Sequence, residues 1–255
     1  MSYRLSSALL TGVAALTFAS VALAAGAARA EEKGLSGLWL LSHHERTQKE
    51  QDEGIDGILP RPDPPLTAQA REDLKTLQVA KRVMTRQRCL PVGMPRIMVN
   101  ELPIEIIESK ERIAIIGEQA ELARTIYLNS DDNAAEGQPS WNGVSYGKWV
   151  GDELVVQVSS LNDQVPHILG GPTGPNATHI EERYKVVDGG KGLTITFTFT
   201  DTKLLTKPYS ISYHYDRQPP GSQRWEYICD VDDPQWSTAL GYDPNTGKPT
   251  APPSK

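Results

Sequence analysis

The sequence reads LTITFTFT over Leu193–Thr200, and this stretch decides the fold class. Its odd-numbered positions are apolar and its even-numbered positions are threonine. This period of two is typical of a β-strand with one buried face and one polar face. Phenylalanine, isoleucine and threonine are also residue types that favour strands. The stretch therefore predicts a strand whose odd-numbered side chains point into the core of a sheet protein.

Two neighbouring segments show the same alternation. Over Tyr209–Asp216 every second residue is apolar, and three of these are Tyr209, Tyr213 and Tyr215. Over Thr178–Val187 the alternation places Glu182 on the same face as Ile180 and Tyr184. A carboxylate is therefore predicted on an otherwise apolar strand face, inside the protein.

Short β-rich runs separated by turn residues fill much of the remaining chain. They are Leu35–Ser42, Ile104–Ile107, Arg112–Ile116, Leu122–Leu128, Val144–Val150, Glu153–Ser159 and Arg224–Cys229. A helical pattern lies at about residues 68–82, after the N-cap candidate Thr67. With about ten strands, one N-terminal helix and no βαβ alternation, the chain is predicted to be all-β and mainly antiparallel. A single lipocalin-like or calycin-like barrel, or a sandwich, would remove the edges of such a sheet.

The two ends of the chain are predicted to lie outside this domain. Arg4 precedes an uncharged run that ends in Ala28-Arg29-Ala30, so residues 1–30 are predicted to be a secretory signal peptide. The alternative is a retained membrane anchor, because the run approaches the length of a spanning helix. Residues 31–242 then form one domain, and the Pro- and Gly-rich residues 243–255 form a disordered tail. We expect a periplasmic protein without stable membrane insertion after the signal is cleaved.

Charge and cysteine content narrow the partners and the compartment. The formal net charge of −6 provides no basic surface for a polyanion, so nucleic acid is not an expected partner. The two cysteines, Cys89 and Cys229, predict one disulfide in an oxidising compartment. Closing so long a loop would stabilise the fold by roughly 4 to 5 kcal/mol in the chain-entropy model. A reactive thiol is the alternative, but neither cysteine has an adjacent His or Lys.

The candidate site is built around Glu182. A buried carboxyl group either finds hydrogen-bond donors or shifts its pKa upward, and in the second case it can act as a general acid or base. The candidate catalytic residues are Glu182, His167 in a predicted loop, and His179, although His179 faces the opposite side of its strand. The alternatives are a structural ion pair of Glu182 with an inward arginine such as Arg124, and a solvated loop position for His167.

Aromatic side chains supply most of the other candidate contacts. The candidate ligand-binding residues are Trp141, Tyr146, Tyr184, Tyr209, Tyr213, Tyr215 and Glu226. Trp141 lies beside an Asn-Gly turn and is expected at the rim of the barrel. The alternative for each aromatic residue is an ordinary core position.

No cofactor or metal is predicted. The neighbouring side chains of His43-His44-Glu45 would point to opposite faces of a strand. The run Asp131-Asp132-Asn133 lacks the glycine and the closing glutamate of a Ca²⁺ loop. The chain also has no P-loop, no Rossmann fingerprint and no Cys-x-x-Cys motif.

Polar groups on an apolar inner face lead to three hypotheses about function. The first is a barrel that binds a small, largely apolar molecule in a cavity dotted with polar groups. The second is a cofactor-free lyase, isomerase or hydrolase, with Glu182 as the base and His167 or a tyrosine hydroxyl as the acid. The third is an accessory protein whose long loops, His43–Pro65 and Asn129–Gly143, dock an envelope partner. The oligomeric state is left open.

The block from Cys89 to Asp230 contains an ordered series of short motifs. They are Cys89–Pro95 (CLPVGMP), Pro103–Ile107 (PIEII), Arg124–Leu128 (RTIYL), Pro139–Gly143 (PSWNG), Gly147–Val156 (GKWVGDELVV), Pro166-His167, His179–Tyr184 (HIEERY), Leu205–Tyr209 (LTKPY) and Glu226–Cys229 (EYIC). By these motifs the chain resembles a family of exported bacterial proteins from sphingomonad-like and acidobacterial genomes. The resemblance implies export and both cysteines, and it brings no established reaction. The family often has His directly after the Trp-Asn-Gly turn, where this chain has Val144.

A second, weaker similarity concerns the first predicted strand. Gly37-Leu38-Trp39 resembles the Gly-x-Trp opening of lipocalin-type barrels. Because so short a motif is common by chance, it favours a barrel only together with the number of predicted strands.

Overall fold

The computed structural model describes residues 34–44, 47–49, 58, 60, 62–75, 89–118, 123–128, 138–164, 166–172 and 177–225. All of them belong to one compact unit, Lys33–Lys255. The predicted signal peptide and C-terminal tail lie outside the described residues, as do Glu226 and Cys229.

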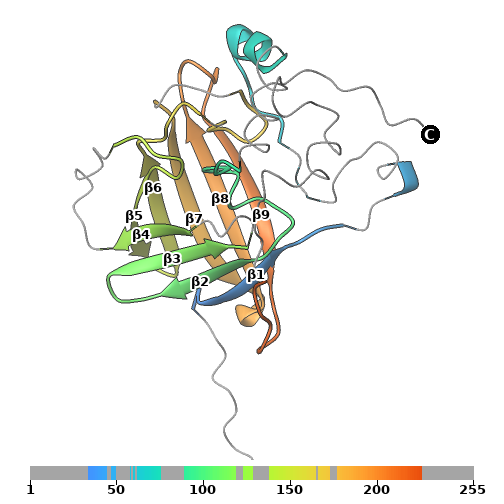
Figure 1. The fold of residues 1–255 in the computed structure, drawn as a ribbon, viewed down its shortest axis with the longest axis vertical. Helices are drawn as coiled ribbons and strands as arrows, with labels where there is room; N and C mark the ends of the chain where they lie inside the picture. Colours follow the sequence, from blue (N-terminus) through green and yellow to red (C-terminus); the bar gives the residue numbers. More distant parts are fainter. Residues whose placement is uncertain are drawn as a thin grey trace, which may run out of the picture. The chain divides into compact units, whose positions relative to one another are not determined.

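The described strands form a closed barrel in which each strand pairs with the next and the last pairs with the first (Figure 1). They are β1 (Gly37–Leu41), β2 (Ile104–Glu108), β3 (Arg112–Gly117), β4 (Ala123–Leu128), β5 (Val144–Val150), β6 (Glu153–Ser159), β7 (His179–Val187), β8 (Gly192–Thr200) and β9 (Tyr209–Arg217). Closure leaves no unpaired strand edge, which is the physical reason an all-β chain of this length adopts it. The predicted all-β barrel is confirmed.

The strand faces agree with the alternation in the sequence. In β7, β8 and β9 the register places Glu182 beside Phe197, and Phe197 beside Ile211. All three side chains are buried on the inner face. The rings of Phe197 and Phe199 stack with centroids 6.3 Å apart, and Tyr213 meets Phe197 edge-on. The long strand pairs of this half of the barrel therefore present an aromatic inner wall.

One strand pair differs from the predicted pattern. Strands β4 and β5 are parallel, with Ile126 opposite Ser145, whereas every other pair is antiparallel. Two consecutive parallel strands require the chain to return to the end of the barrel at which the first strand of the pair, here β4, began. Because β4 and β5 run in the same direction, Arg124 near the start of β4 and Ser145 near the start of β5 lie near the same end of the barrel. Most of the predicted loop Asn129–Gly143 lies outside the described residues.

The predicted helix is described only in part, and the last predicted strand is corrected. Helical structure is described over residues 68–75, and Thr67 caps its start because the Thr67 hydroxyl accepts a hydrogen bond from the Ala70 amide at 3.2 Å. The remainder of the predicted helix, to Arg82, lies outside the described residues. The last predicted strand was placed from Arg224, but Arg224 and Trp225 are not in a strand, and Trp225 is exposed.

Trp39 in β1 is buried, and it lies opposite Arg217 of the last strand. The Trp39 indole donates to the Leu35 carbonyl at 2.8 Å, and the Arg217 guanidinium lies 4.1 Å from the centre of the Trp39 ring. Arg217 also donates to the carbonyl oxygens of Ser36 and Gly34, at 2.5 and 2.7 Å. A cation–π contact of this kind is worth about 0.5 to 2 kcal/mol. The contacts join the first strand to the last.

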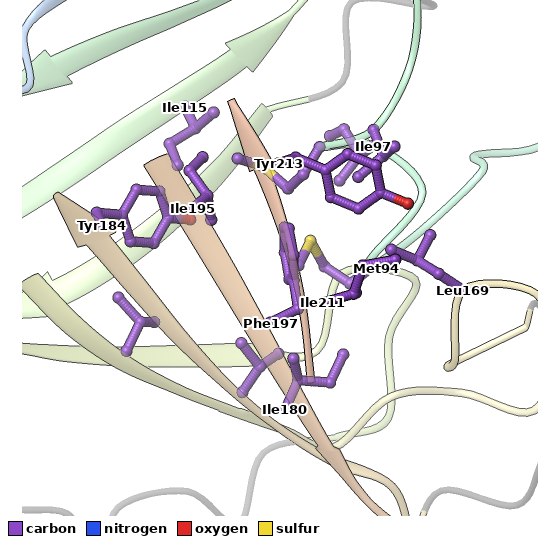
Figure 2. Close-up of a cluster of buried hydrophobic side chains, with 14 of the residues drawn as sticks. Met94, Ile97, Ile115, Leu169, Ile180, Tyr184, Ile195, Phe197, Ile211 and Tyr213 are labelled. Carbon is purple, nitrogen blue, oxygen red and sulfur yellow. The ribbon is translucent and has the colours of Figure 1, made fainter. Parts of the chain in front are cut away.

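Residues 93–100, which we call the plug, lie inside the barrel toward its other end. Met94, Ile97 and Met98 are buried, and Figure 2 shows Met94 and Ile97 beside the inner-wall side chains of Ile211 and Tyr213. The Met94 amide donates to the Trp141 carbonyl at 3.0 Å. The inner face was expected to border a cavity dotted with polar groups. Instead, in the part of the chain that the structure describes, plug side chains cover much of it.

Candidate functional site

Glu182 lies buried in the barrel wall and accepts three hydrogen bonds. Arg124 Nη1 donates to both carboxylate oxygens, at 2.8 and 3.0 Å, and the Tyr184 hydroxyl donates to Oε2 at 2.8 Å. The side chains of Arg124 and Glu182 are 1% and 0% exposed. A carboxylate can be buried only when such donors compensate for the water it loses. The predicted ion pair between Glu182 and Arg124 is confirmed.

Arg124 reaches this position because β4 turns every second side chain inward. Its Nη2 atom donates to Ser145 Oγ at 2.7 Å across the parallel β4–β5 pair, and Nη1 lies 3.3 Å from the Met94 sulfur. The Nε atom is buried and has no hydrogen-bond partner among the described residues. Buried N–H groups are almost always paired, so an unpaired guanidinium N–H inside a barrel needs a physical explanation.

The electrostatics of the cluster keep both Arg124 and Tyr184 protonated. Burial, the largest single influence, lowers the pKa of Arg124, but the charges and hydrogen bonds of Glu182 and Tyr184 together outweigh burial and raise this pKa above its ordinary value. Burial, followed by the negative charge of Glu182, raises the pKa of Tyr184 well above its usual range. Near neutral pH, Arg124 is therefore a cation and Tyr184 a neutral hydrogen-bond donor.

This arrangement is poorly suited to general-base catalysis by Glu182. Both carboxylate oxygens already accept hydrogen bonds from groups that stay protonated near neutral pH. A proton transfer to Glu182 would remove the negative charge that strengthens these hydrogen bonds, at a site with no water to compensate. The cluster is better suited to holding charge in a fixed place than to moving a proton.

The predicted partner His167 belongs to a separate network. It is buried rather than solvated: Nε2 contacts the Asn162 carbonyl, and Nδ1 lies 3.3 Å from the Thr178 hydroxyl. The Thr178 hydroxyl donates to Asp201 at 2.7 Å, and Asp201 accepts from the Leu204 amide at 3.0 Å. These contacts tie the loop after β6 to the loop after β8. His167 therefore has a structural role that its loop sequence did not indicate.

The third candidate catalytic residue lies on the other side of the wall. His179 is exposed at the start of β7, whereas Glu182, three residues later, is buried. Side chains an odd number of residues apart on a strand face opposite ways. The structure therefore does not bring His179, Glu182 and His167 together through any described contact.

The predicted aromatic contacts divide between the inside and the outside of the barrel. Tyr184, Tyr213 and Tyr215 are buried on the inner face. Tyr209 is half-buried at the start of β9, and its hydroxyl accepts a hydrogen bond from the Asp63 amide at 3.2 Å. The position of Tyr146 corrects the expectation of an inner contact. Its neighbours Ser145 and Gly147 face inward, so Tyr146 lies outside, with its ring centre 6.0 Å from that of Tyr127.

Trp141 is half-buried, and its backbone carbonyl, described above, accepts the hydrogen bond from the plug. Its expected place at the rim of the barrel stays a prediction. Glu226, the remaining candidate ligand contact, lies outside the described residues.

Ser145 was not among the predicted site residues, although a pattern in the chain points to it. Residues 143–147 read GVSYG and match the Gly-x-Ser-x-Gly pattern of hydrolase nucleophiles. That pattern is meaningful at a sharp turn between a strand and a helix. Ser145 instead lies within β5, with its oxygen bonded to Arg124. Its place in the structure favours a role in holding Arg124 over a role as a nucleophile.

Comparison with known proteins adds no assignment to this geometry. No protein-family model matches the chain, and no curated protein sequence matches it. The resemblance to exported bacterial proteins therefore stays a prediction.

Two further features concern membranes and metals. Among the described residues, no helix has the length and apolar character needed to cross a bilayer. The same residues contain no group of three or more His, Cys, Asp or Glu side chains placed to hold a metal ion.

Proposed function

We propose that this protein binds a small, largely apolar molecule inside its barrel, with one polar group of that molecule placed against Arg124. The observation that carries the proposal is the Arg124 Nε–H group, which is buried in the barrel and unpaired among the described residues. Ligand sites commonly combine apolar walls with a few fixed polar groups, and a closed barrel is compatible with such a site. The aromatic inner wall of β8 and β9 would contact the apolar body.

The plug would have to move for a ligand to enter. The wall residues Ile195 and Phe197 have no exposed surface, so the space beside them is filled in the structure as described. Two of the buried plug residues are Met94 and Met98, whose unbranched side chains adapt easily to a new neighbour. We propose that the ligand takes the place of plug side chains next to Arg124.

We also propose that the protein is exported and acts in the periplasm. The basic residue, uncharged run and Ala-x-Ala pattern at the N-terminus support this. A disulfide between Cys89 and Cys229 would suit that compartment, and the described residues include no free cysteine. A lipocalin-like relationship is a further proposal, supported by the Gly37-Leu38-Trp39 tripeptide on the first strand of a closed barrel.

Native mass spectrometry of the full chain, expressed with its own signal, tests the function. We expect the folded protein to carry a co-purifying organic molecule that is released on denaturation. The fraction of protein that carries this molecule should fall in the Tyr184→Phe variant, which alters the inner cluster. It should be unchanged in Tyr146→Phe, which changes the outer face. If the fraction carrying a ligand is the same in the unaltered protein and in both variants, the result would contradict a site at Arg124.

The same experiment tests export and the disulfide. The intact mass should correspond to cleavage after Ala30, with two hydrogens fewer than the reduced chain. An uncleaved or fully reduced chain would contradict these two proposals without bearing on the ligand.

A further inference from the structure

We infer that the group bound by Arg124 is a neutral oxygen acceptor, such as a ketone, ester or amide carbonyl, and not a carboxylate or phosphate. This inference rests on the proposed function and names the chemistry of the ligand. Three observations carry it: the Arg124 Nε atom that has no partner among the described residues, the charge balance around it, and the apolar surroundings.

Nε is the Arg124 nitrogen that has no hydrogen-bond partner among the described residues. Arg124 Nη1 is engaged by Glu182 and faces the Met94 sulfur, and Nη2 donates to Ser145. Anions usually bind arginine through two parallel hydrogen bonds that use both edges of the fork. An anion bound through Nε and Nη2 would have to share Nη2 with Ser145, whereas a single acceptor atom can pair with Nε–H alone.

The charge around this donor is already balanced. Arg124 and Glu182 form a pair of opposite charges, and Tyr184 and Ser145 are neutral. Among the buried residues that the structure describes, Arg124 is the only arginine or lysine, while the acids Glu118 and Asp201 are also buried. An added anion would lack a compensating cation in a region of low dielectric constant, which is strongly unfavourable. A neutral carbonyl oxygen satisfies Nε–H without this cost.

The surroundings favour an apolar body on the carbonyl. Ile115 pairs with Arg124 across β3 and β4, and Ile126 follows Arg124 on the same inward face. Both isoleucines are fully buried, and Met94 covers the guanidinium from the plug. A hydrocarbon alone would fit such walls, but it would leave the Nε–H group unpaired. A carbonyl on a hydrocarbon body meets both requirements.

Matched small molecules test the inference. Acetophenone, benzoate and ethylbenzene have nearly the same shape and differ in having a neutral acceptor, an anion or no acceptor. A second set, 2-nonanone, octanoate and octane, covers flexible ligands. Each is titrated at pH 7.4 into the delipidated mature protein, labelled with ¹⁵N-arginine. Dissociation constants come from the shifts of protein signals, and the Arg124 Nε–H signal is assigned by its loss in Arg124→Lys.

In at least one set, we expect the ketone to bind about tenfold or more tightly than the acid and the hydrocarbon, as for a hydrogen bond to a charged donor. The Arg124 Nε–H signal should move on ketone binding. If Arg124→Lys does not fold, assignment by a three-dimensional heteronuclear experiment keeps the Nε–H measurement available. The Tyr146→Phe variant should bind the ketone as the unaltered protein does.

Three other outcomes are decisive against the inference. Equal or tighter binding of the acid would show that the site prefers an anion, and the proposed function would stand without the inference. Equal binding of the hydrocarbon, with the Nε–H signal unmoved, would show that Arg124 does not contact the ligand. Failure of all six molecules to bind would overturn the proposed function as well.

Discussion

Glu182→Gln tests the energetics of the buried cluster, because this substitution removes the negative charge while keeping the shape of the side chain. Arg124 would keep its charge at a site where its side chain is 1% exposed. At the observed separation of 2.8 Å, the attraction amounts to about 6 kcal/mol for an effective dielectric constant near 20. Breaking one member of a buried pair costs about 3 to 5 kcal/mol in proteins generally.

We expect Glu182→Gln to fall at the lower end of that range, near 3 kcal/mol, because an amide oxygen still accepts one hydrogen bond. Urea unfolding followed by circular dichroism measures this, and the melting temperature should fall by about 6 to 12 °C. The matched control is Glu181→Gln, one residue away on the outer face, where the Arg183 contact is partly exposed. The control should lose less than about 1 kcal/mol.

A double-mutant cycle separates the pair from its surroundings. The double variant Arg124→Met, Glu182→Leu should be within about 2 kcal/mol of the unaltered protein, because a well-packed apolar replacement removes both charges together. The reasoning would be refuted if Glu182→Gln cost less than about 1 kcal/mol, or if the double variant lost as much stability as the two single variants added together.

Three further outcomes follow from the same contacts. The pKa of Tyr184 and that of Tyr215 are raised by burial, so the unfolded chain releases these protons first and unfolding free energy should fall as pH rises above about 10. Absorbance at 295 nm should show both hydroxyls resisting ionisation until the protein unfolds, and Tyr184→Phe should reduce the loss of stability. Tyr215→Phe removes the hydroxyl that donates to the Met98 carbonyl at 2.7 Å, so it should lower the unfolding free energy by about 1 kcal/mol. Because this hydrogen bond holds the plug, the variant should also bind ligand faster in stopped-flow measurements, and an unchanged binding rate would argue against movement of the plug. Thr178→Val removes the donor to Asp201 and should cost about 1 to 3 kcal/mol in thermal unfolding, whereas an unchanged melting temperature would show that this network adds no stability.

Several features of the barrel were predictable because strand faces follow a local rule. A period of two assigns inner and outer residues without knowledge of the rest of the fold. This rule placed Glu182, Tyr213 and Tyr215 inside correctly, and it separated His179 from Glu182. It also identified Arg124 as a partner for the buried acid, because an inward arginine and an inward carboxylate tend to meet.

The same rule would have excluded Tyr146 from the interior. Tyr146 is next to the inward-facing Ser145, and adjacent strand residues point opposite ways. Tyr146 was predicted to contact a ligand because it is aromatic and close to Trp141 in the sequence, and neither property fixes the side of the barrel wall. The error shows that residue type is weaker evidence than position along a strand.

Local patterns could not reveal the long-range contacts, since these depend on which segments meet after closure. Nothing in the plug sequence indicates that Met94 lies on Arg124, or that Met98 meets Tyr215 from 117 positions away. The burial of His167 likewise depends on two loops that meet only in the folded barrel. The sequence by itself determined the strands, their inner faces and the presence of a buried acid. Tertiary structure alone decided what covers that acid and which donor is left unpaired, because these follow from three-dimensional packing and not from sequence period.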